Sequence, residues 1–336
     1  MIDMNRKMIP PDVEIGGFFG LDLPDCGDAF PDVIKFQSGR AALRAALECA
    51  GITRVMLPAY ICDSVIQAII DAGAVVETYR LDDSLYPKCL PDSLPEKCAL
   101  LYVNYFGLCA ANVTRLVQKT PNSQLIIDNS HALLALPTKV LATIYSPRKF
   151  VGVPDGGLLV TSGLEINVPE DEDKNSLARI RHLLLRMAYT AKDGYPDYIE
   201  SEKSLENTRP LRMSGLTSRI LASIDMTTLK CWRRENYLAL ATRLDKYNAI
   251  KWELDPESVP LCYPLILGSE VQHLRNTLAG KGIYIPIYWP DARPRVSDGI
   301  EHLMVNCCLA VPCDQRYSVD HMAYLADEIV AGLNNK

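Results

Sequence analysis

Two kinds of apolar pattern alternate along the first half of the sequence. Short, nearly continuous apolar runs such as VMLPAY (55–60) and CALLYVNYF (98–106) predict buried strands. Between them, the segments that start at Ser38 and Ile61 repeat their apolar residues at intervals of three and four, which predicts amphipathic helices. Further strands are expected at 74–82, 123–130 and 156–162, and a further helix at 112–120. Strands that alternate with helices indicate an α/β fold with a mostly parallel sheet.

The second half of the sequence is mainly helical in pattern and ends in a smaller unit. The acidic stretch 168–176 is expected to be a solvated loop, whereas 175–194 has a helical pattern and 197–210 is polar. A long amphipathic segment at 213–247 is suited to join a large domain to a small one. Short strands and two helices then predict a compact α+β domain (259–267, 270–282, 308–313 and 318–333). We therefore expect an N-terminal arm at 1–30, a large domain at 31–235 and a small domain at 236–336.

Composition restricts the classes of function. The chain has 336 residues, of which 48% are hydrophobic and 23% charged, as in ordinary globular proteins. Its net charge is -6 and it has no basic stripe, which argues against a nucleic-acid partner. No stretch resembles a membrane span or a signal-peptide core, so we expect no membrane association and a cytoplasmic location. The 11 cysteines form no CxxC pair and the 5 histidines are isolated, so we expect reduced thiols and no metal site.

The stretch SPRKFVGVPDGG (146–157) encloses one lysine, Lys149, between prolines and glycines just before an expected strand. A surface lysine needs no such setting. A lysine that forms a Schiff base with a carbonyl needs a fixed position and an amine that can lose its proton. The best-known carbonyl partner is pyridoxal 5'-phosphate (PLP). That cofactor also requires a carboxylate for its ring nitrogen and a cradle for its phosphate.

The sequence offers both of these groups. Asp128 ends the apolar run of IIDNSH and can hold the ring nitrogen; alternatively it only caps a turn after a strand. Ser38, Gly39 and Arg40 open the first predicted helix, whose free N–H groups and positive dipole end suit a phosphate. The alternative is a simple serine N-cap. Ser146 can add a hydroxyl to the phosphate from the lysine side.

The order of cradle, carboxylate and lysine resembles the aspartate-aminotransferase superfamily, the fold type I PLP enzymes. Within it the chain is most similar to the DegT/StrS group, best known as nucleotide-sugar aminotransferases. The matching motifs are SGRAAL at the first helix, Asp128-Asn129-Ser130-His131, Lys149 with its Gly156-Gly157, and Arg212-Met213-Ser214. The resemblance covers roughly residues 30 to 325 and is strong at these motifs. It implies a three-layer PLP-dependent transferase fold, bound PLP, and a homodimer. It also implies an amino-acid donor and a keto acceptor, either a keto sugar nucleotide or a related small molecule.

The chain departs from the group at several positions. Arg40 stands where the group usually has threonine, and Ser146 lies three residues before the lysine instead of five. The aromatic residue that often stacks on the cofactor ring is replaced by Cys62, with Tyr60 two residues earlier. Pro210 stands where the group often has an asparagine that reaches the neighbouring subunit. These changes indicate a divergent branch with its own substrate.

The resemblance assigns roles to the candidate site residues. Lys149, Asp128 and His131 are the expected catalytic residues; His131 lies over the ring or bonds its phenolic oxygen, unless it is only a core histidine. Arg316 is expected to clamp the donor carboxylate, with a solvated loop arginine as the alternative, and Trp289 to line the pocket or pack in a core. Arg212 is also expected near the substrate. The expected cofactor-binding set is Ser38, Gly39, Arg40, Tyr60, Cys62, Asp128, His131, Ser146 and Lys149.

Two rival functions stay open at this point. PLP enzymes of one fold catalyse different reactions, and no motif here shows which substrate bond is broken. The altered cradle also permits a protein that binds the cofactor without turnover and serves as a sensor or scaffold. The retained lysine and carboxylate favour the aminotransferase.

Overall fold

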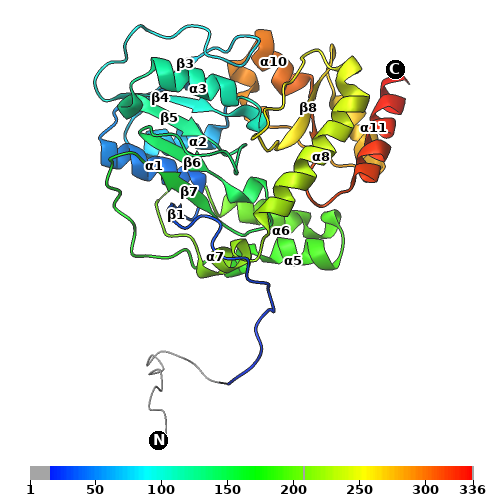
Figure 1. Ribbon diagram of the computed structural model, residues 1–336, viewed down its shortest axis with the longest axis horizontal. Coiled ribbons are helices and arrows are strands. Elements are labelled where there is room, and N and C mark those ends of the chain that lie inside the picture. Colours follow the sequence, from blue (N-terminus) through cyan, green and yellow to red (C-terminus); the bar gives the residue numbers. More distant parts are fainter. Residues whose placement is uncertain (1–15, 207–208, 335–336) are drawn as a thin grey trace, which may run out of the picture.

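A seven-stranded sheet forms the centre of the larger part of the molecule (Figure 1). The computed structural model describes residues 16–206 and 209–334. The strand order is β1-β7-β6-β5-β4-β2-β3; the five strands from β6 to β3 run parallel, and β7 pairs antiparallel with both β6 and β1, so β1 runs in the same direction as the five parallel strands. The expected mostly parallel α/β sheet is confirmed. The strands are β1 (Ile34–Phe36), β2 (Arg54–Pro58), β3 (Val75–Tyr79), β4 (Cys98–Val103), β5 (Leu125–Asp128), β6 (Ala142–Tyr145) and β7 (Gly157–Val160).

Every residue of the central strands β4, β5 and β6 is buried. Both faces of this sheet are therefore covered, as expected of a parallel sheet between helices. The first three helices are α1 (Gly39–Ala50), α2 (Asp63–Asp71) and α3 (Ala110–Lys119). Helix α1 has the ends that its sequence predicts. The Ser38 hydroxyl accepts a hydrogen bond from the N–H of Ala41, and Gly51 ends the helix in the left-handed region with φ of 61°.

The rest of the chain forms a helical connection and a smaller lobe. The connection consists of α4 (Ser176–Arg179), α5 (Arg181–Ala188), α6 (Ala191–Lys203), α7 (Gly215–Leu221) and α8 (Met226–Leu244). The small lobe, residues 259–334, contains β8 (Cys262–Ile266), α9 (Gln272–Gly280), α10 (Gly299–Asn306), β9 (Cys308–Pro312) and α11 (Val319–Asn334). Strands β8 and β9 pair antiparallel, and α8, α9 and α11 share a core with them. The predicted boundary at 235 falls inside the continuous helix α8, and the domain limits stay a prediction.

One expectation about the connection needs correction. The acidic stretch is not uniformly solvated: Asp173 is buried and pairs with the buried Arg179. A carboxylate enters the interior when a guanidinium there meets its charge. The polar stretch at 197–210 begins as the second half of α6, which a capping box between Thr190 and Asp193 starts.

The described helices include none that is long and apolar enough to cross a membrane. Within the same residues, no group of three or more His, Cys, Asp or Glu side chains is arranged to hold a metal ion. Residues 1–15 of the expected arm lie outside the described ranges.

Candidate active site

The expected site motifs meet at one edge of the seven-stranded sheet. Parallel strands β5 and β6 end there, at Asp128 and Tyr145. Strand β7 runs the opposite way, so it begins at this edge with Gly157, opposite Phe36 at the end of β1. The start of α1, the carboxylate and the lysine turn therefore lie together at the carboxyl edge, where open α/β sheets bind their ligands.

Lys149 ends the short helix η3 (Pro147–Lys149), which follows β6. Its amine lies 5.3 Å from the centre of the Trp289 ring and 5.9 Å from that of Tyr288. Burial lowers the pKa of Lys149, while Cys62 and Asp128 act in the opposite direction. The amine has no hydrogen-bond partner among the described residues. Lys149 is thus a partly buried lysine whose amine loses its proton more readily than in water, as a nucleophilic lysine requires.

Asp128 is a buried carboxylate that faces the same cavity as Lys149. One of its oxygens accepts a hydrogen bond from the N–H of Ser130 at 2.8 Å. The other oxygen has no hydrogen-bond partner in the part of the chain that the structure describes. The site therefore contains a fixed carboxylate with one oxygen available to a ligand.

The start of α1 forms the cradle. Its N-terminal residues Ser38, Gly39 and Arg40 all line the cavity. Burial lowers the pKa of the Arg40 guanidinium, and no hydrogen bond or ion pair holds it among the described residues. Gly157 permits the close approach of β7 to this turn, since an added Cβ would lie 2.1 Å from the carbonyl carbon of Ser38.

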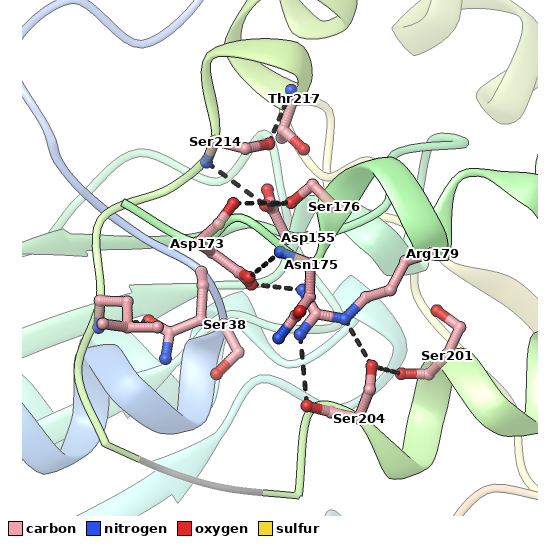
Figure 2. A network of polar contacts seen from close by, with 12 residues as sticks. Ser38, Asp155, Asp173, Asn175, Ser176, Arg179, Ser201, Ser204, Ser214 and Thr217 are labelled. Atoms are coloured by element: carbon pink, nitrogen blue, oxygen red, sulfur yellow. Dashed lines mark hydrogen bonds and ion pairs between the residues drawn. The ribbon is translucent and has the colours of Figure 1, made fainter. Parts of the chain in front are cut away.

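A buried polar network surrounds Asp155, which lies two residues before β7 (Figure 2). Asp155 accepts hydrogen bonds from the hydroxyl of Ser176 and from the N–H of Ser214. The next residue, Gly156, donates its N–H to the carbonyl of Gln37 at 2.7 Å. The network thus joins the residues just before β7 to the cradle and to the start of α7.

His131 is fully buried, and it is not part of the cavity wall. Its Nδ1 accepts a hydrogen bond from the N–H of Phe106, so a neutral ring carries its proton on Nε2. Nε2 has no partner in the described chain. Burial and then the charge of Lys149 lower the pKa of His131 well below 6.5, which keeps the ring neutral. Tyr60 is also buried away from the cavity wall, and its hydroxyl donates to the carbonyl of Tyr288 at 3.2 Å.

A segment of the small lobe, which we call the strap (residues 284–295), covers one side of the site. It carries Trp289 in the left-handed region, with φ of 53°. Asp291 of the strap accepts the N–H of Asp63, and Arg295 binds the Asp63 carboxylate and the carbonyls of Ala59 and Ile61. The strap therefore closes the cavity by binding the loop that follows β2, and it places the indole of Trp289 in the wall.

Two arginines of the expected set have partners of their own. Arg316 lines the cavity, but it binds both oxygens of Asp314, at 2.7 and 2.9 Å. Arg212 does not line the cavity; its Nε donates to the carbonyl of Glu170 at 3.1 Å, and its backbone forms bridges with Phe36 and Glu172. The structure thus brings the expected residues together at the cavity wall except Tyr60, His131 and Arg212.

Several cavity residues were not expected from the sequence. Arg148 precedes Lys149, pairs with Glu202 of α6, and keeps a buried Nε without a partner among the described residues. The hairpin of α5 and α6 contributes further side chains to the wall: His182, Arg186, Met187, Tyr189, Tyr198 and Glu202. Arg233 of α8 reaches the wall from a third direction. Only Arg148 had a signal in the sequence, since it lies inside the lysine motif; the others depend on how distant helices pack.

The cavity encloses about 1570 Å³. That is more than the ~300–1,000 Å³ typical of a site for one small molecule. Its wall carries more cations than carboxylates: Arg40, Arg148, Lys149, Arg186, Arg233 and Arg316 against Asp128, Glu202, Asp291 and Asp314. The site is therefore suited to a large anionic ligand, or to more than one ligand.

The sheet order, the lysine after β6 and the small C-terminal lobe define the PLP-dependent transferase fold. Solved structures with this fold resemble the chain over most of its length. Spr1654 from Streptococcus pneumoniae in its PLP form has a TM-score of 0.63 and 13% identity, covering 91% of this chain and 88% of its own. The aminotransferase TlmJ from Streptoalloteichus hindustanus has a TM-score of 0.61 and 18% identity, covering 90% and 86%.

A third similar structure is PseC from Helicobacter pylori, an aminotransferase involved in the biosynthesis of pseudoaminic acid. It has a TM-score of 0.60 and 14% identity, and the match covers 90% of this chain and 87% of PseC. No protein-family model matches the sequence, and no curated protein matches it. The predicted fold class is confirmed by these structures.

Proposed function

We propose that this protein is a PLP-dependent aminotransferase that uses an amino-acid donor and a keto acceptor. One observation carries the proposal: Lys149, Asp128 and Arg40 come from three separate parts of the sequence and line one cavity. A lysine with a lowered pKa, a buried carboxylate and a free guanidinium at a helix start are an unusual combination for a purely structural pocket.

These residues fit PLP group by group. The N–H groups at the start of α1, with Arg40 and Ser146, suit the phosphate. Asp128 has a free oxygen for the ring nitrogen. His131 lies behind the cavity wall, stacked on Trp289, so we assign it no contact with the phenolic oxygen. Lys149 supplies the amine that links to the aldehyde. When bound, PLP supplies that aldehyde and a ring that draws electrons from the substrate carbon.

The side chains of this protein then have distinct tasks. Lys149 moves a proton at the substrate carbon, for which its lowered pKa is favourable. Asp128 keeps a negative charge in a buried position, where electrostatic interactions are strong. His131 stays neutral and remains a hydrogen-bond donor at Nε2. The strap limits the access of water to these groups from the small-lobe side.

The cavity also supports an acceptor larger than an amino acid. Its volume and its excess of cations suit an anionic molecule such as a keto sugar attached to a nucleotide. The similar structures point the same way, since CalS13 from Micromonospora echinospora is a sugar aminotransferase. We therefore propose a keto sugar nucleotide, or a related keto compound, as the acceptor.

We further propose that the protein works as a homodimer. The side chains of Phe18 and Phe19 are 99% and 97% exposed, on an arm that extends away from the body of the molecule (Figure 1). The base of this arm is held to α7 by Arg219, which donates to the carbonyls of Leu23 and Pro24. Adjacent exposed phenyl groups on an anchored arm favour a protein partner, and a second copy of the chain is the simplest one.

The test is an absorbance titration of the purified protein with PLP, followed by addition of glutamate and other amino acids. An aminotransferase turns yellow with PLP and then bleaches as the cofactor converts to pyridoxamine phosphate. A protein that binds PLP but gives no conversion with any amino acid would support one of the two rival functions, a different PLP reaction or a sensor or scaffold. Absence of PLP binding would reject all of these functions. Sedimentation at assay concentration tests the dimer separately.

A further inference from the structure

Arg233 is a buried arginine of α8 that joins three separate segments around the lysine turn. Its side chain is in the wall of the cavity and only 2% of the residue is exposed. The guanidinium donates from Nε to Gln315 at 2.8 Å and from Nη1 to the carbonyls of Pro260 and Leu261 at 3.2 and 3.1 Å. From Nη2 it donates to the carbonyl of Phe150 at 3.1 Å.

All these acceptors are neutral, although the guanidinium is charged. The acid beside it, Asp314, is already bound by Arg316 through both oxygens. Burying a cation among neutral acceptors is costly, and an apolar side chain of similar volume often serves stability as well or better. We therefore relate the role of Arg233 to the geometry of its guanidinium and not to its charge. The planar set of N–H groups holds several carbonyls at fixed relative positions.

The carbonyl of Phe150 is the most informative of these acceptors, because Phe150 follows Lys149 directly. It lies at the end of η3, where a helix leaves its carbonyls without internal partners. Two side chains supply the missing donors: Nη2 of Arg233 and Nε2 of Gln315, the latter at 2.9 Å. The guanidinium also lies over the Phe150 ring, 4.5 Å from its centre.

The lysine turn (residues 146–151) is also supported by the burial of Phe150 and Val151 in a hydrophobic cluster and by the ion pair of Arg148 with Glu202. Its own hydrogen bonds are those of one short helical turn, from Lys149 to Ser146 and from Phe150 and Val151 to Pro147. A single turn of this kind is weak without packing or outside bonds. Arg233 and Gln315 connect it to α8, to the start of the small lobe at 260–261, and to the loop after β9.

We propose that Arg233, together with Gln315, is a positioning residue for Lys149. It fixes the peptide after the lysine relative to both lobes, so that the amine occupies one place in the cavity. The inference rests on the proposed function for its consequence in catalysis, but the positioning itself belongs to the protein without cofactor. The two can therefore be tested apart.

The first measurement is hydrogen exchange of the backbone amides at 150–152, in protein without PLP. The variants are Arg233→Met, Arg233→Lys and Gln315→Leu. The matched control is Arg234→Met, since Arg234 also holds carbonyls of this region, those of Asp255 and Ser258, but does not touch Phe150. We expect exchange at 150–152 to be about tenfold faster or more in the Arg233 and Gln315 variants, and unchanged in the control.

The second measurement is the single-turnover reaction of the PLP-loaded protein with glutamate. We expect the limiting rate to fall about tenfold or more in Arg233→Met, with the half-saturating glutamate concentration nearly unchanged. Arg233→Lys keeps the charge without the planar set of N–H groups, so it should resemble Arg233→Met. Full recovery of exchange protection and rate in the lysine variant would show that charge alone matters and would overturn the proposal.

Unchanged exchange at 150–152 in both Arg233→Met and Gln315→Leu would also overturn it. A uniform increase of exchange throughout the chain in these variants would show a merely structural role, and it would reject the positioning role as well. If Arg233→Met does not fold, Gln315→Leu decides, because it removes one of the two donors to Phe150 and leaves α8 intact. A wild-type protein that fails to bind PLP would reject the proposed function, while the exchange experiment would still decide the positioning role.

Discussion

The indole of Trp289 stacks on the imidazole of His131, with ring centres 4.8 Å apart and planes 14° from parallel. His131 lies three residues after Asp128, whereas Trp289 belongs to the strap of the small lobe. The stack therefore connects the small lobe to the loop that follows β5 and Asp128 in the large sheet. It also places the indole beside the amine of Lys149.

Replacing Trp289 by alanine should weaken substrate binding more than cofactor binding. The change removes the stack on His131 and opens the cavity wall, and aromatic pairs contribute about 0.5–1.5 kcal/mol beyond the area they bury. We expect the half-saturating concentrations of donor and acceptor to rise about tenfold, and Trp289→Phe to recover most of the loss. Steady-state kinetics of both variants provide the check. Equal kinetics for wild type and alanine variant would remove Trp289 from the substrate site.

Lys149→Ala should abolish the covalent link to PLP. Borohydride reduction of the wild type with PLP should label a peptide that contains Lys149, as mass spectrometry can show. The variant should give no label and no half-reaction with glutamate. Lys139→Ala is the control, because Lys139 is exposed and lies outside the cavity wall. Labelling at another lysine in the wild type would contradict the assignment.

Asp128→Asn should slow the half-reaction while nearly preserving the shape of the site. The amide cannot supply the negative charge for the ring nitrogen, and lost charge stabilisation of this kind typically costs about 3–4 kcal/mol at the transition state. We expect a fall of roughly 10²–10³-fold in the rate with glutamate. Rapid-mixing absorbance measures it, with Asp320→Asn on the surface of α11 as control. A rate within about twofold of wild type argues against the role.

Arg40→Thr should weaken PLP binding without destabilising the free protein. A charge-assisted bond to the phosphate is worth about 1.5–3 kcal/mol, which is roughly 10- to 100-fold in affinity. Without ligand, a cation at a helix start is disfavoured by about 0.3–1 kcal/mol, so the unliganded variant should be at least as stable. PLP titration tests the expected loss of affinity, and thermal unfolding tests the stability of the free protein. Arg44→Met is the control, because Arg44 binds Glu48 further along α1. Unchanged affinity in Arg40→Thr, together with loss of binding in Gly39→Val, would assign the cradle to the backbone alone.

His131 should make the stability of the free protein depend on pH. Its pKa is lowered in the folded state, so below about 6.5 the unfolded chain binds a proton that the folded protein does not. The free energy of unfolding should therefore decrease as the pH falls from about 7 to about 5.5, by at most about 1.4 kcal/mol per pH unit from this group. His131→Gln should flatten the dependence, whereas His273→Gln on the exposed face of α9 should not. Urea unfolding across this range would show it, and equal slopes for wild type and His131→Gln would contradict it.

The sequence predicted the parts of the fold that depend on local pattern. Helix α1 has both its signals within the chain, a serine before it and a glycine after it, and the structure begins and ends it there. The motifs around Asp128 and Lys149 follow strands of the sheet, so their meeting at one edge follows from parallel topology. Strand β1 and helix α10 were missed, because a three-residue strand and a short helix give weak periodic signals.

Other features depend on the three-dimensional placement of single side chains, which the apolar pattern does not encode. Asp173 lies in an acidic run that looks solvated, and only the packing of α4 brings Arg179 to it. Arg233 follows a tryptophan and precedes another arginine in a segment rich in charges, so its burial has no local signal. Arg316 was expected either to clamp a donor carboxylate or to be a solvated loop arginine, and the structure pairs it with Asp314, two residues away.

The pairing of β1 with β7 also affects how the chain folds during synthesis. Strand β1 leaves the ribosome first, but it pairs with the last strand of the large sheet, and Ser38 bridges Gly156. Protein synthesis adds about 5–20 residues per second, so β7 is made on the order of ten seconds after the cradle. A nascent chain halted before Gly157 therefore contains the cradle sequence and the lysine but not the paired edge that aligns them. The cradle and the lysine turn can therefore be aligned only after β7 has emerged.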